Sequence, residues 1–134
     1  MDSNLVARSA IVIDAPPSRV WEALVDPDAL REYMFGAEVR SDWRKGSRIT
    51  WKGDWKGKPY EDKGEILEVE PPRRLRYTHS SHHTVSFDLS ADGERTRVAL
   101  SQDGNADEEA RRHSEQNWDT MLAGLKRYVE SSAA

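Results

Sequence analysis

The sequence predicts an α+β domain built from one strand, two short helices, a run of antiparallel strands and a long C-terminal helix. Apolar residues alternate with polar ones near the N-terminus and again from about residue 36 to residue 103, which is the period of a strand with one buried face. Glycine, proline and aspartate pairs divide the second region into short runs, as in a meander of hairpins. After residue 103 the apolar period becomes that of a helix.

The first strand is expected over residues 5–15, where apolar or small residues alternate with polar ones. Pro16 and Pro17 stop it, and a short helix follows. A second short helix is expected with Asp26 as its N-cap and Pro27 at its first position. The apolar stripe of this second helix is Leu30, Tyr33 and Met34.

Six further strands are expected in the central region. Their ranges are 37–43, 47–55, 60–70, 73–80, 83–90 and 95–102. Pro71 and Pro72 have no amide hydrogen for a sheet ladder, so we expect them at the corner between two strands. Carboxylates fall mostly at surface positions, and Glu68 is expected to face inward only if its strand carries a bulge.

The closing helix is expected to begin after Asn105, which stands three residues before Glu108 in an arrangement like a capping box. Its apolar stripe is Trp118, Met121, Leu122, Leu125, Tyr128 and Val129. The two preceding turns on that side carry smaller and more polar residues, among them Ser114 and Asn117. The helix is therefore expected to seal a core near its end and to leave space near its start.

Composition excludes several classes of protein. The 134 residues suit a single domain over 1–134, and 37% apolar content with five Trp argues against disorder. The net charge of −4 argues against a general nucleic-acid binder. The lack of cysteine excludes disulfides and thiolate metal sites. The sequence has no signal peptide and no run of apolar residues long enough to span a bilayer, so we expect a cytoplasmic protein without membrane insertion. We also expect no cofactor, and a monomer or a weak homodimer.

Three of the four histidines fall within five positions, at residues 79, 82 and 83. Zinc needs three or four converging ligands, and strand alternation points only His79 inward, so no metal site is expected. His82 and His83 are interpreted as solvated residues of a hairpin turn. For His79 two interpretations remain open: a histidine packed in the core, or a residue that contacts a ligand or transfers protons.

Two other patterns resemble binding motifs but are better explained by a loop and by an alternating strand. Residues 103–114 begin like a calcium loop but carry Glu108 where that loop needs glycine and Ser114 where it needs glutamate. Residues 40–63 interleave basic residues with three Trp, yet in an alternating strand the basic residues face solvent and the aromatic ones face the core. Neither cation binding nor nucleic-acid binding is expected.

Three stretches resemble one protein family. "DAPPSRVWEALVDPDALREYM" resembles the family's opening motif, "GEILEVEPPRRLRYTH" its central hairpin and "NWDTMLAGLKRYVE" its closing helix. The family is the START-like, birch-pollen-allergen-like superfamily, also called SRPBCC. Within it, the sequence is similar to the branch of the activator of the heat-shock-ninety ATPase. The motifs span nearly the whole chain.

The resemblance implies a helix-grip fold, in which a strongly curved antiparallel sheet of six to seven strands wraps around the C-terminal helix. It also implies an apolar cavity where sheet and helix do not meet, with a few polar groups to orient a ligand. The expected ligand-binding residues are Tyr33, Ile49, Trp51, Ile66, Leu75, Tyr77, His79, Val85, Phe87, Val98, Leu100, Ser114, Asn117, Trp118 and Met121.

Three functions remain open. We favour a non-catalytic domain that binds a small hydrophobic or amphipathic molecule, including a lipid. The second is a partner-binding, co-chaperone-like activator of an ATPase; against it, activators of that family carry an additional domain ahead of this one, whereas the first strand here is expected at about residue 5. The third is a cavity enzyme of the cyclase, dehydratase or hydrolase type that uses His79 and Tyr77.

Overall fold

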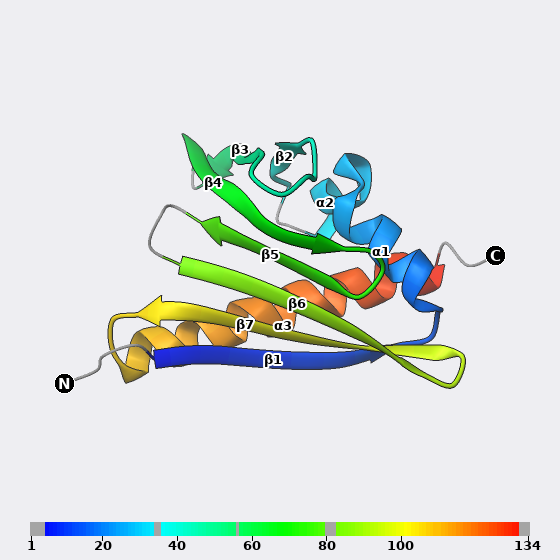
Figure 1. Ribbon diagram of the computed structural model, residues 1–134. Helices are drawn as coiled ribbons and strands as arrows, with labels where there is room; N and C mark the ends of the chain where they lie inside the picture. The colour runs from blue at the N-terminus through cyan, green and yellow to red at the C-terminus, as the bar shows by residue number, and fades with distance from the viewer. Residues whose placement is uncertain (1–4, 34–35, 56, 80–82, 132–134) are drawn as a thin grey trace.

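The computed structural model describes residues 5–33, 36–55, 57–79 and 83–131. Ten elements follow one another along the chain (Figure 1). They are β1 (Leu5–Ile13), α1 (Pro17–Val25), α2 (Pro27–Tyr33), β2 (Glu38–Ser41), β3 (Arg48–Trp55), β4 (Lys58–Glu70), β5 (Arg74–His79), β6 (His83–Asp92), β7 (Arg95–Asn105) and α3 (Glu108–Ser131). The predicted order of elements is confirmed. The expectations for Met34 and His82 lie outside the described residues.

The seven strands form one antiparallel sheet in the order β1-β7-β6-β5-β4-β3-β2. The first strand therefore pairs with the last, and the sheet curves around α3 (Figure 1). The short helices α1 and α2 lie at one end of this arrangement, next to the C-terminal part of α3 (Figure 1). Pro71 and Pro72 occupy the turn between β4 and β5, as expected.

Several strand boundaries differ from the sequence prediction by one to three residues, and two of these differences have a clear local reason. β2 ends at Ser41 rather than residue 43, because Trp43 adopts φ 56°, a left-handed conformation that cannot continue a strand. β7 continues to Asn105, so this residue is not the helix cap. Its side-chain amide donates to the carbonyl oxygens of Leu5 and Gln102, at 2.9 and 3.0 Å. Asp107 caps α3 instead, where its carboxylate accepts the Ala110 amide at 2.8 Å.

β4 carries the bulge on which the inward placement of Glu68 depended. Its register with β5 shifts between Ile66 and Glu68. Glu68 nevertheless lies on the outer face, where it forms ion pairs with Arg74 and Arg76 at 3.6 and 3.8 Å. The bulge thus serves the surface charge network and adds no carboxylate to the interior.

Burial along α3 is uneven, and this unevenness positions the site. Four side chains in its second half, those of Met121, Leu122, Leu125 and Val129, are at most 1% exposed and belong to the core cluster. Residues from Glu108 to Thr120 are all half-buried or exposed. The helix therefore closes the core only from Met121 onward, as its polar first turns predicted. No helix among residues 5–33, 36–55, 57–79 and 83–131 has the length and apolar character needed to cross a membrane.

Candidate ligand-binding cavity

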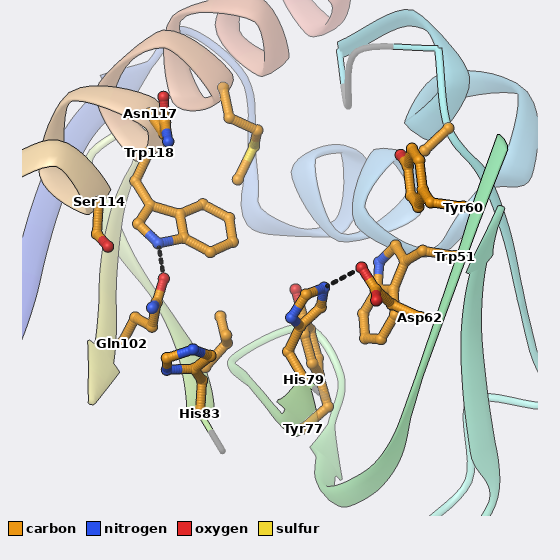
Figure 2. Close-up of a pocket in the computed structure, with 13 residues that line it drawn as sticks. Trp51, Tyr60, Asp62, Tyr77, His79, His83, Gln102, Ser114, Asn117 and Trp118 are labelled. Atoms are coloured by element: carbon orange, nitrogen blue, oxygen red, sulfur yellow. Dashed lines mark hydrogen bonds and ion pairs between the residues drawn. The ribbon is translucent and has the colours of Figure 1, made fainter. Parts of the chain in front are cut away.

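A cavity of about 590 Å³ lies between the first half of α3 and the concave face of the sheet (Figure 2). This volume is within the range of small-molecule sites. Side chains of α3 form one wall, and side chains from β3, β4 and β5 form the opposite wall (Figure 2). The lining residues are Ala37, Trp51, Tyr60, Asp62, Tyr77, His79, His83, Val85, Gln102, Ser114, Asn117, Trp118 and Met121.

The helix wall is held by hydrogen bonds to β7. The Trp118 indole nitrogen donates to the side-chain oxygen of Gln102 (Figure 2). The Ser114 hydroxyl donates to the Asn105 side-chain oxygen at 2.7 Å. These bonds connect polar groups of both elements and fix the first half of α3 without filling the space between helix and sheet.

The sheet wall is aromatic. The Trp51 ring lies 4.4 Å from the His79 ring and 5.4 Å from the Tyr77 ring, measured between centroids. Phe87 lies behind this layer, 6.2 Å from Tyr77 and 6.3 Å from Trp118. Because the rings support one another, the wall presents fixed aromatic surface to the cavity.

A carboxylate and an imidazole meet at this wall. Nε2 of His79 lies 3.5 Å from a carboxylate oxygen of Asp62 (Figure 2). Burial lowers the pKa of His79; the Asp62 charge opposes this shift, and His83 adds to it. The burial effect prevails although the His79 side chain keeps 35% of its exposure, so His79 is neutral near pH 7.

His83 is fixed by a backbone oxygen. Its Nδ1 lies 2.9 Å from the carbonyl oxygen of Asp103. A carbonyl only accepts hydrogen bonds, so Nδ1 carries the proton. In the neutral ring Nε2 is then a hydrogen-bond acceptor.

Two tyrosines of the cavity are held in the phenol form. Burial raises the pKa of Tyr77 well above its ordinary value. The pKa of Tyr60 is also raised, by burial first and then by the charges of Asp62 and Asp54. Both hydroxyls therefore remain uncharged at neutral pH.

Eight of the predicted ligand-binding residues line the cavity: Trp51, Tyr77, His79, Val85, Ser114, Asn117, Trp118 and Met121. The other seven belong to the packed core: Tyr33, Ile49, Ile66, Leu75, Phe87, Val98 and Leu100. The periodicity of the strands, and of α2 for Tyr33, correctly assigned these seven residues to the inner face of the fold. It could not separate the part of that face that α3 covers from the part that it leaves open.

Five lining residues were missed: Ala37, Tyr60, Asp62, His83 and Gln102. The signal for four of them was present in the strand alternation. Tyr60 and Asp62 share a strand face with Ile66, His83 shares one with Val85, and Gln102 shares one with Leu100. His83 begins β6, as the predicted strand 83–90 has it, but it pairs directly with His79 and lines the cavity instead of lying in a solvated turn.

The cavity does not assemble a metal site from the residues that the structure describes. Within residues 5–33, 36–55, 57–79 and 83–131, no group of three or more His, Asp or Glu residues is arranged to hold an ion. His79, His83 and Asp62 therefore act here as polar groups of an otherwise aromatic and apolar lining.

A curved antiparallel sheet that holds a C-terminal helix, with a cavity between them, defines the helix-grip class of START-like proteins. The chain belongs to the family described as "Activator of Hsp90 ATPase homolog 1-like protein", whose model matches residues 14–130. The resemblance found in the sequence is thereby confirmed.

Solved structures share this fold over almost the whole chain. A solution structure from Cytophaga hutchinsonii is 46% identical, with a TM-score of 0.85 over 98% of this chain and 97% of that one. A crystal structure from Mesorhizobium loti is 21% identical, with a TM-score of 0.85 over 97% and 100% of the two chains. The Aha1 dimer from Colwellia psychrerythraea is 19% identical, with a TM-score of 0.79 over 97% and 99%. No curated protein matches this chain.

Proposed function

We propose that the protein binds a small hydrophobic or amphipathic molecule in the cavity between the sheet and α3. The observation that supports this most directly is the space of about 590 Å³ between the sheet and α3, with its aromatic wall and a few polar groups. Binding would remove apolar surface of the ligand from water, which stabilises a complex by about 25 cal/mol per Å² before the costs of association.

The polar groups of the cavity would orient the ligand. Gln102 and Ser114 are already engaged with the protein through Trp118 and Asn105. His79 and Asp62 lie on the other side of the cavity, on β5 and β4, and His83 on β6 lies between them and Gln102 of β7 (Figure 2). A molecule with an apolar body and one polar end suits this distribution better than a uniformly polar one.

The test is to fill the cavity from the helix. Asn117 lies on the exposed part of α3 and lines the cavity, so Asn117→Trp adds bulk there without disturbing the core. Gln116→Trp adds the same bulk at the neighbouring exposed position and is the matched control. Native mass spectrometry and calorimetry with decan-1-ol as the probe should show binding to the parent and to Gln116→Trp but not to Asn117→Trp. Equal binding to all three would refute the cavity as the site.

A second proposal is activation of a chaperone ATPase, and its support is the family description alone. A coupled ATPase assay with a heat-shock-ninety chaperone tests it, and no stimulation at saturating protein would reject it. The enzyme hypothesis stays a prediction: His79→Ala should abolish turnover of any substrate found while preserving the fold.

A further inference from the structure

The described part of the cavity lining offers negative charge and no permanent positive charge. Among the thirteen described residues that line it, Asp62 is the only carboxylate and none is Lys or Arg. A carboxylate accepts hydrogen bonds and carries negative charge when ionised. An anionic ligand would therefore meet a like charge without a cationic side chain to balance it.

The imidazole beside Asp62 does not neutralise this charge. Burial lowers the pKa of His79, so the ring is neutral near pH 7 and contacts the carboxylate as a polar, uncharged partner. The Asp62 side chain keeps 39% of its exposure, so part of the carboxylate remains accessible.

Aromatic side chains frame the carboxylate. Trp51 is its direct partner across the β3–β4 pair. Tyr60 precedes it by two positions on the same face of β4, and the Tyr60 ring covers Gly53 on the neighbouring strand. Both rings and the carboxylate lie on the same wall of the cavity (Figure 2).

This combination is the chemistry that recognises organic cations. The face of a tryptophan or tyrosine ring attracts a cation within about 6 Å, and the attraction grows when the cation is removed from water. A carboxylate beside the rings adds charge complementarity. The first turn of α3 offers no compensating anion site, because it carries Glu108 and Glu109.

We propose that the cavity selects an amphipathic cation, whose protonated amine or quaternary ammonium group lies beside the Asp62 carboxylate and against the rings of Trp51 and Tyr60. The apolar body of this molecule extends toward Trp118 and Met121 on the opposite wall. This inference rests on the proposed function and specifies the charge of its ligand.

Three probes that share one alkyl chain test the proposal: decylamine and decanoate below their micellar concentrations, and decan-1-ol below its solubility limit. Isothermal titration calorimetry at neutral pH and low salt should show decylamine binding about tenfold more tightly than decan-1-ol, with decanoate weakest. In Asp62→Asn, which keeps the shape of the side chain, the preference for the amine over the alcohol should disappear while the alcohol still binds.

Glu61→Gln is the matched control, since it removes the same charge from the adjacent exposed position of β4. It should retain the amine preference, as should Tyr60→Phe, which keeps the ring. Tyr60→Leu should lose part of the preference. Equal or tighter binding of the alcohol by the parent, or an amine preference that survives in Asp62→Asn, would overturn the cation assignment and leave the binding function standing. Failure of all three probes to bind would overturn both.

Discussion

His79 and His83 are direct partners across the β5–β6 pair, and both side chains line the same cavity. Their environments differ. His79 lies against the Trp51 ring and Asp62, whereas His83 is bonded to the backbone oxygen of Asp103. The cavity therefore contains two imidazoles that contact different partners.

The lowered pKa of His79 makes the stability of the protein depend on pH. An unfolded histidine titrates near pH 6.5. As the pH falls below about 6.5, the unfolded chain takes up a proton that the folded chain does not, so the free energy of unfolding decreases until the pH reaches the lower folded pKa. Above about pH 6.5 the residue contributes no pH dependence.

Urea unfolding at several pH values between about 7.5 and 5 should show this decrease in the parent and a smaller one in His79→Gln. His113→Gln is the control, because His113 is an exposed histidine of α3 and its replacement should preserve the parent profile. If stability depended on pH in the same way in the parent and in His79→Gln, the lowered pKa of His79 would be contradicted.

Substitutions of Phe87 and of Trp51 should affect stability and ligand binding to different extents. Phe87 is 3% exposed and lies behind the cavity wall, whereas Trp51 lines the cavity. Phe87→Leu should lower the free energy of unfolding by about 1–2 kcal/mol and change the affinity for decan-1-ol less than twofold. Trp51→Leu should weaken that affinity markedly. Equal losses of affinity in calorimetry would place Phe87 in the site.

Gly64 is required by a close approach of two strands. A Cβ atom there would lie 1.8 Å from the carbonyl oxygen of Thr78, so β4 and β5 would have to separate. Gly64→Ala should therefore lower the free energy of unfolding by about 3 kcal/mol or more.

The control is Gly53→Ala, because a Cβ atom at Gly53 would meet the side chain of Tyr60, at 2.9 Å from its hydroxyl oxygen. This side chain can move, so we expect a loss below about 1 kcal/mol. Thermal and urea unfolding measure both variants. A Gly64→Ala variant as stable as Gly53→Ala would show that the strands are not held this closely.

Thr96 holds the start of β7 against the segment after β1. Its side chain is fully buried, and its hydroxyl donates to the carbonyl oxygen of Ala15 at 2.7 Å. Thr96→Val preserves the shape but leaves that oxygen without the hydroxyl, which should lower the free energy of unfolding by about 1–3 kcal/mol.

Thr120→Val provides the comparison. Its hydroxyl donates to the Gln116 carbonyl oxygen at 3.0 Å on the exposed face of α3, where water can replace the lost bond. The change in urea unfolding should stay within about 0.5 kcal/mol. Similar losses of unfolding free energy in both threonine variants would show that the effect of removing the hydroxyl does not depend on its burial.

Glu130 covers the outer edge of β1. Its carboxylate accepts the Asp14 amide at 2.9 Å and the Lys126 ammonium at 2.6 Å, and the same ammonium donates to the Val12 carbonyl oxygen at 2.9 Å. An edge strand with open amide and carbonyl groups is a template for unwanted pairing. Side chains of α3 thus satisfy backbone groups of this edge.

Glu130→Ala should lower the free energy of unfolding by about 1 kcal/mol and speed amide hydrogen exchange at Asp14. Glu22→Ala removes an exposed carboxylate on α1 and should leave exchange at Asp14 unchanged. Unaltered protection of Asp14 in Glu130→Ala would contradict the role of this carboxylate.

The order of elements, the strand faces and the uneven polarity of α3 could all be predicted from the sequence. Period-two runs identified Trp51, Tyr77 and Val85 as inward, and the turn prolines marked the β4–β5 corner. The change from Ser114 and Asn117 to Met121 located the open end of the helix. These features are local, because periodicity and backbone chemistry act within a few neighbouring residues.

Which inward residues line the cavity and which do not depends on how the helix packs on the sheet, and this could not be predicted. Ile49 and Trp51 share one face of β3 and both are buried, yet Trp51 lines the cavity and Ile49 does not. The difference depends on where α3 crosses the curved sheet, which alternation cannot specify. The contact of Asp62 with His79 likewise depends on the pairing of β4 with β5, because register brings together residues that are distant in the chain.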